Sequence, residues 1–439
     1  MKNRTMIAEL TEKVGEKATI SGWLYKRRLL GGLNFLLIRD RTGLVQVLVE
    51  EEKELQKLQG LQLGSVLMID GDIIKDERAP GGAEIHDPIL SVITPVKEVM
   101  PIEIDKPISH KPEHLDSLFE HRVINIRNTS EQQIFIIQAE IENIIRQYLL
   151  ENNFVPFHSP KILAEATEGG AETFKLEYFG REATLAQSAQ FYKQMMVGAY
   201  ERVFEIGGTY RAEPSTTTRH MSEYITVDVE MGFIESFDDV KKVLSEMLWN
   251  INEKIWLNQK VALEKLDSKK AKLTKDIPEL PLSELHEQYF KATKEDTRGE
   301  KDPTPAEERF ASEYSLKKWG SEAVFITEFP TSEMKFYHHI NEQNPKVCDR
   351  ADLIFRGVEI VTITQREHRY DVLTKQLVDL TGGNPKDPGY KYYLDAFKYG
   401  MPPHGGFGLG LERLTAKIIG LHNVKEATLF PRDMQRLAP

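Results

Sequence analysis

The chain has 439 residues, a formal net charge of −11, 40% hydrophobic residues and 28% charged residues. These values are typical of a globular protein with about two to four domains, and they exclude a disordered chain, a collagen-like fibre or a coiled coil as the main architecture. No stretch approaches the ~18 consecutive apolar residues of a membrane span, and the first ten residues lack the apolar core of a secretory signal. The single cysteine, Cys348, excludes an internal disulfide framework and a Cys-rich zinc site, so we expect a cytoplasmic protein.

The first 100 residues are predicted to form a small β barrel. Alternating apolar and polar residues, interrupted by glycines, indicate five short strands, and residues 51–61 indicate a helix between them. This pattern is typical of an oligonucleotide-binding (OB) barrel, although other small barrels and sandwiches share it. Lys26, Arg27 and Arg28 form a local basic cluster, so the negative charge of the whole chain does not exclude a nucleic-acid ligand.

The rest of the chain is predicted to be a linker and one large α+β domain. Prolines between 95 and 112 indicate a hinge or linker, which we place at residues 101–130. Apolar residues at helical spacing from Ile134 to Tyr148 predict a long amphipathic helix at the start of the second domain, residues 131–439. Within that domain, the polar and Lys/Glu-rich residues 260–310 are expected to form a helical insertion at the surface.

Charged residues interrupt the apolar strand patterns of the second domain. Residues 202–233 predict a strand, a loop and a returning strand, which would bring Arg211, Arg219 and His220 together. Such cations suit a polyphosphate, and the alternative is a solvent-facing hairpin with ion pairs. Glu359 lies in another apolar strand, where it is either half of a structural ion pair or, beside a second carboxylate, a ligand of Mg²⁺.

Four glycines between residues 405 and 410 precede a predicted helix that begins near Glu412 and Arg413. We expect a turn here whose backbone approaches a phosphate or a ring closely, although glycines before a helix often serve packing alone. The segment matches neither the Walker motif nor the dinucleotide-binding fingerprint.

Together, these segments resemble the class II aminoacyl-tRNA synthetases of subgroup IIb, and within it the aspartyl and asparaginyl enzymes. Residues 154–162 (FVPFHSPKI) resemble motif 1, the dimer-interface element. Residues 209–224 (TYRAEPSTTTRHMSEY) resemble motif 2, and residues 406–414 (GFGLGLERL) resemble motif 3. The resemblance covers essentially the whole chain. It implies an N-terminal OB-fold β-barrel that binds the tRNA anticodon, a class II catalytic domain with an antiparallel sheet flanked by helices, and a homodimer that uses ATP and Mg²⁺.

The resemblance also implies an ATP site. Arg211 corresponds to the arginine that holds the α-phosphate and the amino-acid carboxylate, while Arg219 and His220 correspond to residues that meet the γ- and β-phosphates. Tyr224 and Arg413 would lie on opposite faces of the adenine. The expected ATP-binding residues are Arg211, Glu213, Arg219, His220, Met221, Tyr224, Glu359, Gly410 and Arg413; Arg211, Glu359 and Arg413 are expected to be catalytic, and Glu359 and Thr362 to bind Mg²⁺.

The same resemblance implies an amino-acid site and an anticodon site. Arg366 would grip the side-chain carboxylate or carboxamide of the substrate, Phe35 would stack on an anticodon base, and Pro80 resembles the loop of relaxed enzymes that charge both tRNA-Asp and tRNA-Asn. The expected amino-acid-binding residues are Glu168, Gln190, Lys193, Arg211, Thr362 and Arg366, and the expected anticodon-binding residues are Arg27, Phe35, Gln46, Pro80 and Glu84.

The identity of the amino acid is the open point at this stage. Residues 393–408 resemble archaeal-type aspartyl enzymes and favour aspartate, whereas Ala189 and Glu367 resemble asparaginyl enzymes, since the Glu367 carboxylate could accept a hydrogen bond from a carboxamide. Two departures bear on this pocket. Residues 362–364 read Thr-Ile-Thr where the family has a Ser-Gly-Gly or Ser-Gly-Ser run, and the basic residue usually found two places before Phe336 is replaced by Met334, with Lys335 following it.

We therefore predict an aspartate–tRNA ligase that forms aspartyl-adenylate and transfers aspartate to tRNA-Asp, with tRNA-Asn as a second acceptor. The alternatives are an asparagine–tRNA ligase, a synthetase paralogue with another substrate, a regulatory tRNA-binding paralogue, and an adenylating enzyme that transfers to a small nucleophile such as ammonia. The complete set of phosphate-binding residues argues against a regulatory paralogue, and the barrel argues against the last alternative.

Overall fold

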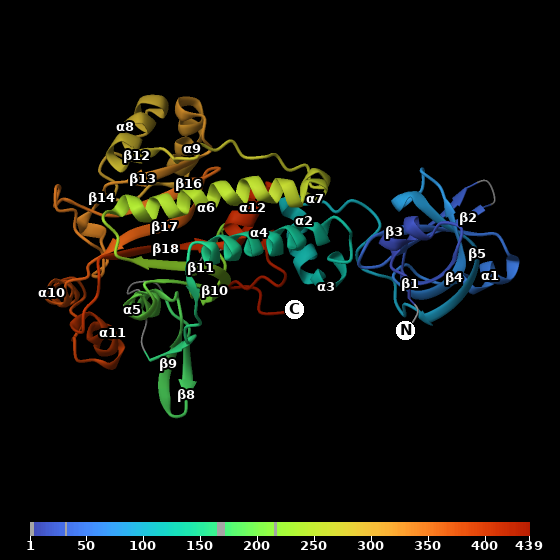
Figure 1. Cartoon of the computed structure of the whole chain (residues 1–439), viewed down its shortest axis with the longest axis horizontal. Helices are drawn as coiled ribbons and strands as arrows, with labels where there is room; N and C mark the ends of the chain where they lie inside the picture. The colour runs from blue at the N-terminus through green and yellow to red at the C-terminus, as the bar shows by residue number, and fades with distance from the viewer. Residues whose placement is uncertain (1–3, 31–32, 165–171, 215–216) are drawn as a thin grey trace. The chain divides into compact units, whose positions relative to one another are not determined.

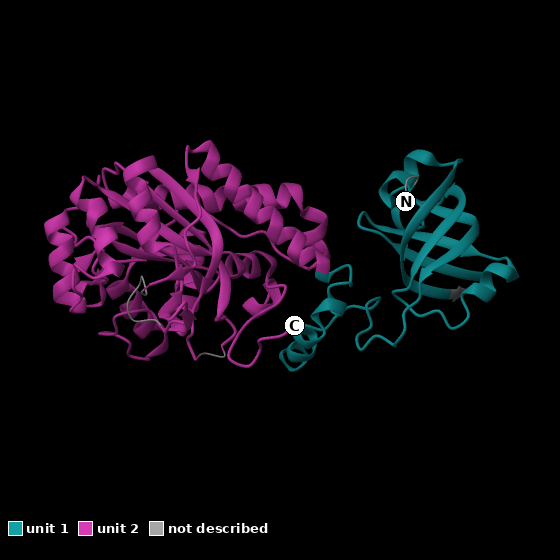
Figure 2. Ribbon diagram, turned by 90° about the horizontal axis from the view of Figure 1, so that it is seen from below, with its two compact units in different colours: residues 1–131 teal, residues 132–439 magenta. Residues whose placement is uncertain are grey.

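In the computed structural model the chain forms two compact units, residues 1–131 and 132–439 (Figures 1 and 2). The structure describes residues 4–30, 33–164, 172–214 and 217–439. In these ranges, no helix combines the length and the apolar character that a membrane crossing requires.

The first unit contains the closed barrel that the sequence predicts, with the strand order β1-β2-β3-β5-β4. Alternating burial is clearest on β3, where Val45 and Val47 lie in the barrel core and the residues beside them are only partly buried. On β2, Leu36 and Ile38 belong to the same core, but Leu37 between them is buried as well. The helix expected between the strands is α1. The bounds are β1 (Lys17–Leu30), β2 (Leu33–Arg39), β3 (Leu44–Val49), α1 (Glu52–Lys57), β4 (Val66–Lys75) and β5 (Ala83–Thr94), with 3₁₀ turns at Ile7–Lys13 and Pro80–Gly82.

The stretch expected to be a linker has secondary structure of its own. It contains α2 (Pro112–Glu120) and α3 (Arg122–Asn125). Arg122 is buried, and its Nη1 lies 3.7 Å from a carboxylate oxygen of Glu131. This stretch therefore packs as part of the first unit, which ends at Glu131.

Within the described residues, eight strands form the main sheet of the second unit in the order β12-β13-β16-β17-β18-β11-β10-β6. Neighbouring strands are antiparallel except at the two edges, where β12–β13 and β10–β6 are parallel. The predicted α+β class is therefore correct, with a sheet that is antiparallel in its centre. The bounds are β6 (Val155–Pro156), β10 (Arg202–Tyr210), β11 (Glu223–Gly232), β12 (Glu279–Pro281), β13 (Ala323–Thr327), β16 (Arg350–Phe355), β17 (Val358–Arg366) and β18 (His404–Gly410).

Two long helices, α4 (Glu131–Glu151) and α6 (Phe237–Asn258), cross one face of this sheet (Figure 1). Five isoleucines of α4 form a single buried stripe, as predicted, and pack in one core with residues of α6, β17 and β18; they are Ile134, Ile137, Ile141, Ile144 and Ile145. The remaining helices of the second unit are α5 (Gln190–Tyr200), α7 (Lys260–Lys265), α8 (Leu282–Thr293), α9 (Pro305–Trp319), α10 (Tyr370–Thr381), α11 (Pro388–Lys398) and α12 (Leu411–Ile419).

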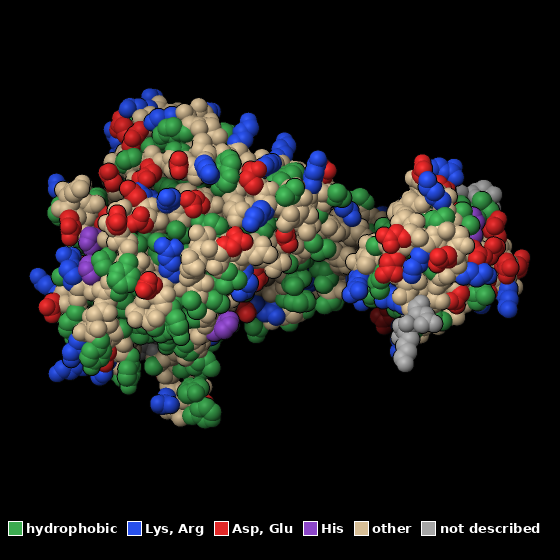
Figure 3. All heavy atoms as spheres, viewed as in Figure 1, with side chains coloured by type: hydrophobic (Ala, Val, Ile, Leu, Met, Phe, Trp, Pro, Cys, Tyr) green, Lys and Arg blue, Asp and Glu red, His purple; other side chains and the backbone are tan. Residues whose placement is uncertain are grey.

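Residues 260–310 are not a purely helical insertion. They contain α7, α8 and the start of α9, but β12 lies between the helices and joins the edge of the main sheet beside β13. Three smaller strands, β7 (Ile162–Leu163), β8 (Lys175–Tyr178) and β9 (Arg181–Leu185), form a separate sheet whose β8–β9 hairpin carries exposed apolar side chains, including Phe179 (Figure 3). A two-stranded sheet pairs β14 (Phe329–Pro330) with β15 (Val347–Cys348).

The glycine-rich segment is a strand, so the predicted turn is wrong. Residues 404–410 form β18, which lies between β11 and β17 in the middle of the sheet. A Cβ atom at Gly406 would lie 2.0 Å from the carbonyl oxygen of Val229, so the close approach of β11 and β18 requires glycine there. Because glycines have no side chains to alternate between two faces, this strand lacks the periodicity by which strands are predicted.

Candidate active site

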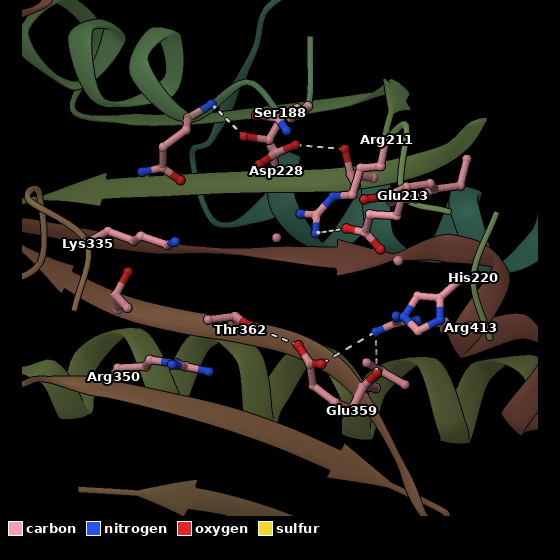
Figure 4. Close-up of a pocket in the computed structure, with 18 of the residues that line it drawn as sticks. Ser188, Arg211, Glu213, His220, Asp228, Lys335, Arg350, Glu359, Thr362 and Arg413 are labelled. Atoms are coloured by element: carbon pink, nitrogen blue, oxygen red, sulfur yellow. Dashed lines mark hydrogen bonds and ion pairs between the residues drawn. The ribbon is translucent and has the colours of Figure 1, made fainter. Parts of the chain in front are cut away.

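A cavity of about 420 Å³ lies over the middle of the main sheet (Figure 4). Strands β11, β16, β17 and β18 contribute to its lining together with α5, α12 and the loop that follows β10. The cavity brings together residues that are more than 200 positions apart in the chain. The predicted site residues that line it are Gln190, Lys193, Arg211, Glu213, Arg219, His220, Met221, Tyr224, Glu359, Thr362, Arg366, Gly410 and Arg413. Glu168, also expected here, lies outside the described residues.

One end of the cavity is formed by the β10–β11 hairpin that the sequence predicts. Arg211 follows β10, and its Nη1 lies 3.5 Å from a carboxylate oxygen of Glu213. On the returning side, the imidazole Nδ1 of His220 lies 2.6 Å from the hydroxyl of Thr217. Burial and the positive charge of Arg413 both lower the pKa of His220, so this imidazole is neutral at pH 7.

A second group of charges lies where β17 faces the start of α12. Arg413 donates to the main-chain oxygen of Glu359 at 2.9 Å, and its guanidinium lies 3.6 Å from the Glu359 carboxylate. The Thr362 hydroxyl donates to the other carboxylate oxygen at 2.9 Å. Burial would raise the pKa of Glu359, but Arg413 and the Thr362 hydrogen bond outweigh it and lower that pKa. Glu359 is therefore ionised and held in place at the cavity wall.

Arg219 is held by a helix that sequence reasoning did not connect with the site. Its Nη1 donates to both carboxylate oxygens of Glu308 on α9 at 2.8 Å. Glu308 also accepts a hydrogen bond from the backbone N–H of Glu359 at 2.9 Å. Since these residues are separated by 51 to 89 positions, only the fold reveals that α9 supports the site.

The other end of the cavity rests on two buried ion pairs. The ammonium group of Lys193 on α5 donates to Asp228 and to the main-chain oxygen of Phe407, both at 2.8 Å. Burial would raise the pKa of Asp228, but Lys193 outweighs it and lowers that pKa. Arg366 donates to both oxygens of Glu230, at 2.9 and 3.2 Å. The four side chains are at most 4% exposed, so each charge depends on its partner.

Comparison with known proteins agrees with this geometry. Residues 114–434 match the family of tRNA synthetases class II (D, K and N), and residues 18–93 match the OB-fold nucleic acid binding domain. The chain belongs to the class II tRNA synthetases.

Relatives of this synthetase match it over almost its full length. It is 40% identical to the aspartate–tRNA(Asp/Asn) ligase of Methanopyrus kandleri, covering 98% of this chain and 97% of the relative. It is 38% identical to the aspartate–tRNA(Asp) ligase of Pyrococcus abyssi, covering 98% of each. Among solved structures, asparaginyl-tRNA synthetase from Pyrococcus horikoshii, complexed with asparaginyl-adenylate, matches with a TM-score of 0.91 and 31% identity over the whole of both chains.

The structure shows where the side chains lie at the two positions at which this sequence departs from the family pattern. Lys335 lines the cavity and points into it, whereas Met334 packs against the hydrophobic cluster beneath β13 (Figure 4). A basic residue therefore still reaches the cavity, from one position later in the chain. On β17, Thr362 and Thr364 line the cavity, but Ile363 is fully buried in the core on the opposite face. The added bulk of Ile363 thus points away from the cavity, whereas the Thr364 side chain lines it.

The two features that favoured asparagine do not reach the cavity. Glu367 is buried and accepts two hydrogen bonds from the guanidinium of Arg369, at 2.8 and 2.7 Å. Ala189 is fully buried at the start of α5 and, among the described residues, is not part of the cavity lining. The hypothesis that Glu367 accepts from a carboxamide therefore finds no support in the geometry.

Sequence reasoning missed two neighbouring side chains on β16. Arg350 lines the cavity, and Asp352, directly opposite Thr362 on β17, accepts from Arg350 at 2.7 Å. A signal was present, because charges two positions apart in an otherwise apolar strand lie on the same face.

The expected anticodon residues lie on the barrel. Phe35 on β2 is half-buried, directly opposite Arg28 on β1. Gln46 and Glu84 are register partners on β3 and β5, and the Gln46 amide donates to the Glu84 carboxylate. Arg27 is exposed, with hydrogen bonds to Leu58 and Asn34, and Pro80 begins the 3₁₀ turn before β5.

Proposed function

We propose that this synthetase is an aspartate–tRNA ligase that charges tRNA-Asp and also tRNA-Asn. The observation that carries the proposal is the charge of the cavity. The described residues that line it include seven Lys and Arg side chains and five Asp and Glu side chains. One of these acids, Glu412, has a pKa raised by burial to about 7 and is thus partly neutral. Cations in this number suit two anionic substrates, ATP and aspartate. Three of them, Arg219, Arg350 and Arg366, also pair with acids outside the lining, which hold their guanidinium groups in place.

The arrangement of side chains fits amino-acid activation. An oxygen of the aspartate α-carboxylate attacks the α-phosphorus of ATP, the bond to the bridging oxygen breaks, and aspartyl-adenylate and pyrophosphate form. Arg211, in the loop after β10, and Arg413, on α12, both line the cavity. We assign them to offset the charge that develops on the phosphate oxygens. A terminal ribose hydroxyl of tRNA then attacks the activated carbonyl and releases AMP. The protein forms no covalent bond in this reaction. It positions the two substrates and stabilises the charge of the transition state.

The residues at β17 fit a magnesium ion bound together with ATP. Glu359 is ionised and accepts from the Thr362 hydroxyl, and hard oxygen ligands of this kind suit Mg²⁺. Mg²⁺ commonly uses one or two protein carboxylates and takes its other ligands from phosphates and water. When bound, the ion would neutralise the phosphate charge, and Glu359 with Thr362 would hold it.

The substrate side chain is assigned to the end of the cavity that carries Lys335 and Arg366. Both are cationic, and the Glu230 carboxylate that pairs with Arg366 lies outside the described lining of the cavity. A carboxylate is favoured over a carboxamide in such surroundings, which supports aspartate over asparagine. Two acceptor tRNAs are supported by the M. kandleri relative, whose name includes both.

We further propose a homodimer that forms through motif 1. Motif 1 contributes β6, which forms one edge of the main sheet beside β10. Val155 on this edge and Ile136 and Leu150 on α4 are exposed apolar side chains, 38 to 48% accessible. A second copy of the chain would cover them. Light scattering on the purified protein should give twice the mass of one chain, and a monomer would contradict the proposal.

The deciding experiment is amino-acid-dependent exchange between ATP and pyrophosphate, run with aspartate, asparagine and the other amino acids in parallel. Exchange with aspartate alone is the expected result. Exchange with asparagine alone would overturn the substrate assignment, and no exchange would indicate a paralogue. Charging of tRNA-Asp and tRNA-Asn transcripts then tests whether one or two acceptors are used.

A further inference from the structure

Arg219 lines the cavity, and its own chain holds only part of its guanidinium. The Nη1 atom donates to both carboxylate oxygens of Glu308 on α9, at 2.8 Å each. Among the residues that the structure describes, no acceptor is found for the Nε or the Nη2 of Arg219. The side chain is 24% exposed and lies at the cavity wall. The fold therefore fixes one nitrogen and leaves the other two for an anion in the cavity.

Glu308 is itself fixed in position. It is buried, and one of its oxygens also accepts a hydrogen bond from the backbone N–H of Glu359 on β17, at 2.9 Å. One turn later on α9, the buried hydroxyl of Ser312 accepts from the backbone N–H of Gly357, which directly precedes β17, at 2.8 Å. Two side chains of α9 thus anchor this helix to the main chain at the start of β17. The acceptor that holds Arg219 is therefore part of the rigid core of the unit.

The main chain of Arg219 is held as well. Arg413 donates through its Nε to the main-chain oxygen of Arg219 at 3.4 Å, and through its Nη1 to the main-chain oxygen of Glu359 at 2.9 Å. Together with the contacts of Glu308, these bonds close a ring that joins the β10–β11 loop, α9, β17 and α12. A guanidinium held at its main chain and at one nitrogen loses little conformational freedom when a ligand binds.

We propose that Glu308 is a positioning residue, which acts through Arg219 to hold a cation in place for the two outer phosphates of ATP. This inference rests on the proposed use of ATP. Because Arg211 and Arg413 are assigned to the reacting phosphate, Arg219 is assigned to the phosphates that leave as pyrophosphate. The alternative is a latch, in which Glu308 competes with ATP for Arg219. The geometry favours positioning, because Nε and Nη2 can bind a phosphate while Nη1 stays on Glu308.

The two interpretations predict opposite effects of Glu308→Gln. This variant removes a negative charge near the phosphates, so a latch, or repulsion alone, predicts tighter ATP binding. Positioning predicts weaker binding, because ATP must then order the Arg219 side chain itself, and we expect the dissociation constant for ATP to rise about tenfold. The value for AMP, which lacks the outer phosphates, should stay within about twofold of that of the unmodified protein.

Isothermal titration calorimetry on the full-length protein, with ATP and with AMP in the same magnesium buffer, measures both dissociation constants. Tighter or unchanged ATP binding by Glu308→Gln would overturn the proposal, and so would equal weakening of ATP and AMP. Glu313→Gln is the matched control, because Glu313 is an exposed acid of the same helix. It should bind both nucleotides as the unmodified protein does. Neither titration requires an amino acid, so failure of aspartate-dependent exchange would leave this result interpretable.

A double-mutant cycle tests whether Glu308 acts through Arg219. The variant that carries both Arg219→Gln and Glu308→Gln should bind ATP no more weakly than Arg219→Gln alone, whereas additive losses would overturn the proposal. In exchange assays with Glu308→Gln, the KM for ATP should rise about tenfold while kcat stays within about threefold, because Arg211 and Arg413 remain. A fall confined to kcat would contradict a role in placing the outer phosphates.

Glu308→Asp keeps the proposal testable if Glu308→Gln does not fold, which thermal unfolding by circular dichroism would reveal. It retains the negative charge but withdraws the carboxylate by one methylene group, so repulsion of the phosphates is unchanged while the contact with Arg219 is lost. We expect ATP binding to weaken about threefold or more, with AMP binding unchanged. Unchanged ATP binding by this variant would reject the positioning role.

Discussion

The barrel fills its interior with aliphatic side chains and leaves its basic cluster at the surface, whereas the second unit carries ion pairs inside its sheet. The core cluster of the barrel, from Ile7 to Leu90, is aliphatic. The buried acids Asp40 and Glu54 pair with cations that are 28% and 34% exposed. Under the cavity of the second unit, by contrast, Lys193 pairs with Asp228 and Arg366 with Glu230, all nearly inaccessible to water. Removing such charges from water costs several kcal/mol of free energy per ion, and the attraction between the paired charges offsets only part of this cost. The second unit thus buries ion pairs at its proposed reaction site, whereas the proposed RNA-binding surface of the barrel does not require them.

The sharpest way to break this comparison is to remove one buried charge and one surface charge of the same type. Lys193→Met leaves Asp228 buried without its partner, so we expect the free energy of unfolding to fall by about 3 to 5 kcal/mol. Lys17→Met is the control, because Lys17 is 83% exposed and its ion pair with Asp72 spans 3.8 Å; its effect should stay below about 1 kcal/mol. Urea unfolding followed by circular dichroism measures both. Similar losses in the two variants would contradict the contrast.

Arg211→Ala tests whether the charges that line the cavity act on the reaction. We expect pyrophosphate exchange to fall by about 100- to 1,000-fold, because a preorganised donor to the developing phosphate charge is lost. The fold should persist, since Arg211 is only partly buried. Exchange kinetics beside a thermal unfolding curve provide the measurement. Near-normal exchange would refute the role assigned to Arg211.

The pH dependence of stability tests how the second unit holds another buried ionisable group, Glu412. Both of its carboxylate oxygens accept from the backbone N–H of Ile225, at 3.0 and 3.1 Å, and burial raises its pKa to about 7. Because this folded-state pKa is raised, Glu412 keeps its proton in the folded protein where the unfolded chain has lost it. Its contribution to stability is therefore present at pH 4 to 5 and is lost as the pH rises through 7.

Glu412→Gln keeps an oxygen acceptor for Ile225 but cannot ionise. Relative to the unmodified protein, this variant should gain about 2 to 3 kcal/mol in free energy of unfolding between pH 5 and pH 8. Urea unfolding at the two pH values measures the difference between the two proteins. A difference that does not change with pH would exclude a raised pKa.

The smallest expected effect concerns the barrel. Phe35→Ala removes the aromatic surface for an anticodon base. The kcat/KM for tRNA charging should therefore fall by an amount that corresponds to about 1 to 3 kcal/mol of transition-state free energy. Exchange without tRNA should be unchanged, because Phe35 lies in the first unit and the cavity in the second. Parallel charging and exchange assays check this. Equal loss of tRNA charging and of pyrophosphate exchange would argue against anticodon binding by the first unit and amino-acid activation by the second.

Much of this architecture could be predicted from sequence because its signals are local. The isoleucines of α4 at helical spacing, from Ile134 to Ile145, and the alternating valines of β3 are buried as their spacing predicts. The β10–β11 hairpin brings together the charges that its pattern indicates. The strand β18 could not be predicted in this way, since glycines give no periodicity. Its identity depends on pairing with β11 and β17, which are distant in the chain.

Apart from Glu168, which lies outside the described residues, the predicted ATP- and amino-acid-binding residues line one cavity. The partners that hold them could not be predicted from the sequence. Nothing near Arg219 indicates Glu308, which is 89 positions away, and nothing near Lys193 indicates the Phe407 carbonyl, 214 positions away. Glu367 shows the opposite error. Its side chain suggested a substrate contact, but an arginine two positions later holds it away from the cavity. Whether a carboxylate contacts the substrate or a neighbouring arginine depends on the three-dimensional arrangement, which the sequence does not show.

The glycine strand β18 also bears on how this protein can evolve. Part of the cavity floor is main chain at Gly408 and Gly410, and next to it Gly406 has no room for even a methyl group beside Val229. A side chain at Gly406 would therefore force β11 and β18 apart, so this position resists substitution. A Cβ at Gly408 or Gly410 would meet only ordinary van der Waals contacts, so a larger residue there would narrow the cavity without breaking the sheet. Adaptation to another amino acid is thus open at Gly408 and Gly410 as well as at Lys335 and Thr364, and closed at Gly406.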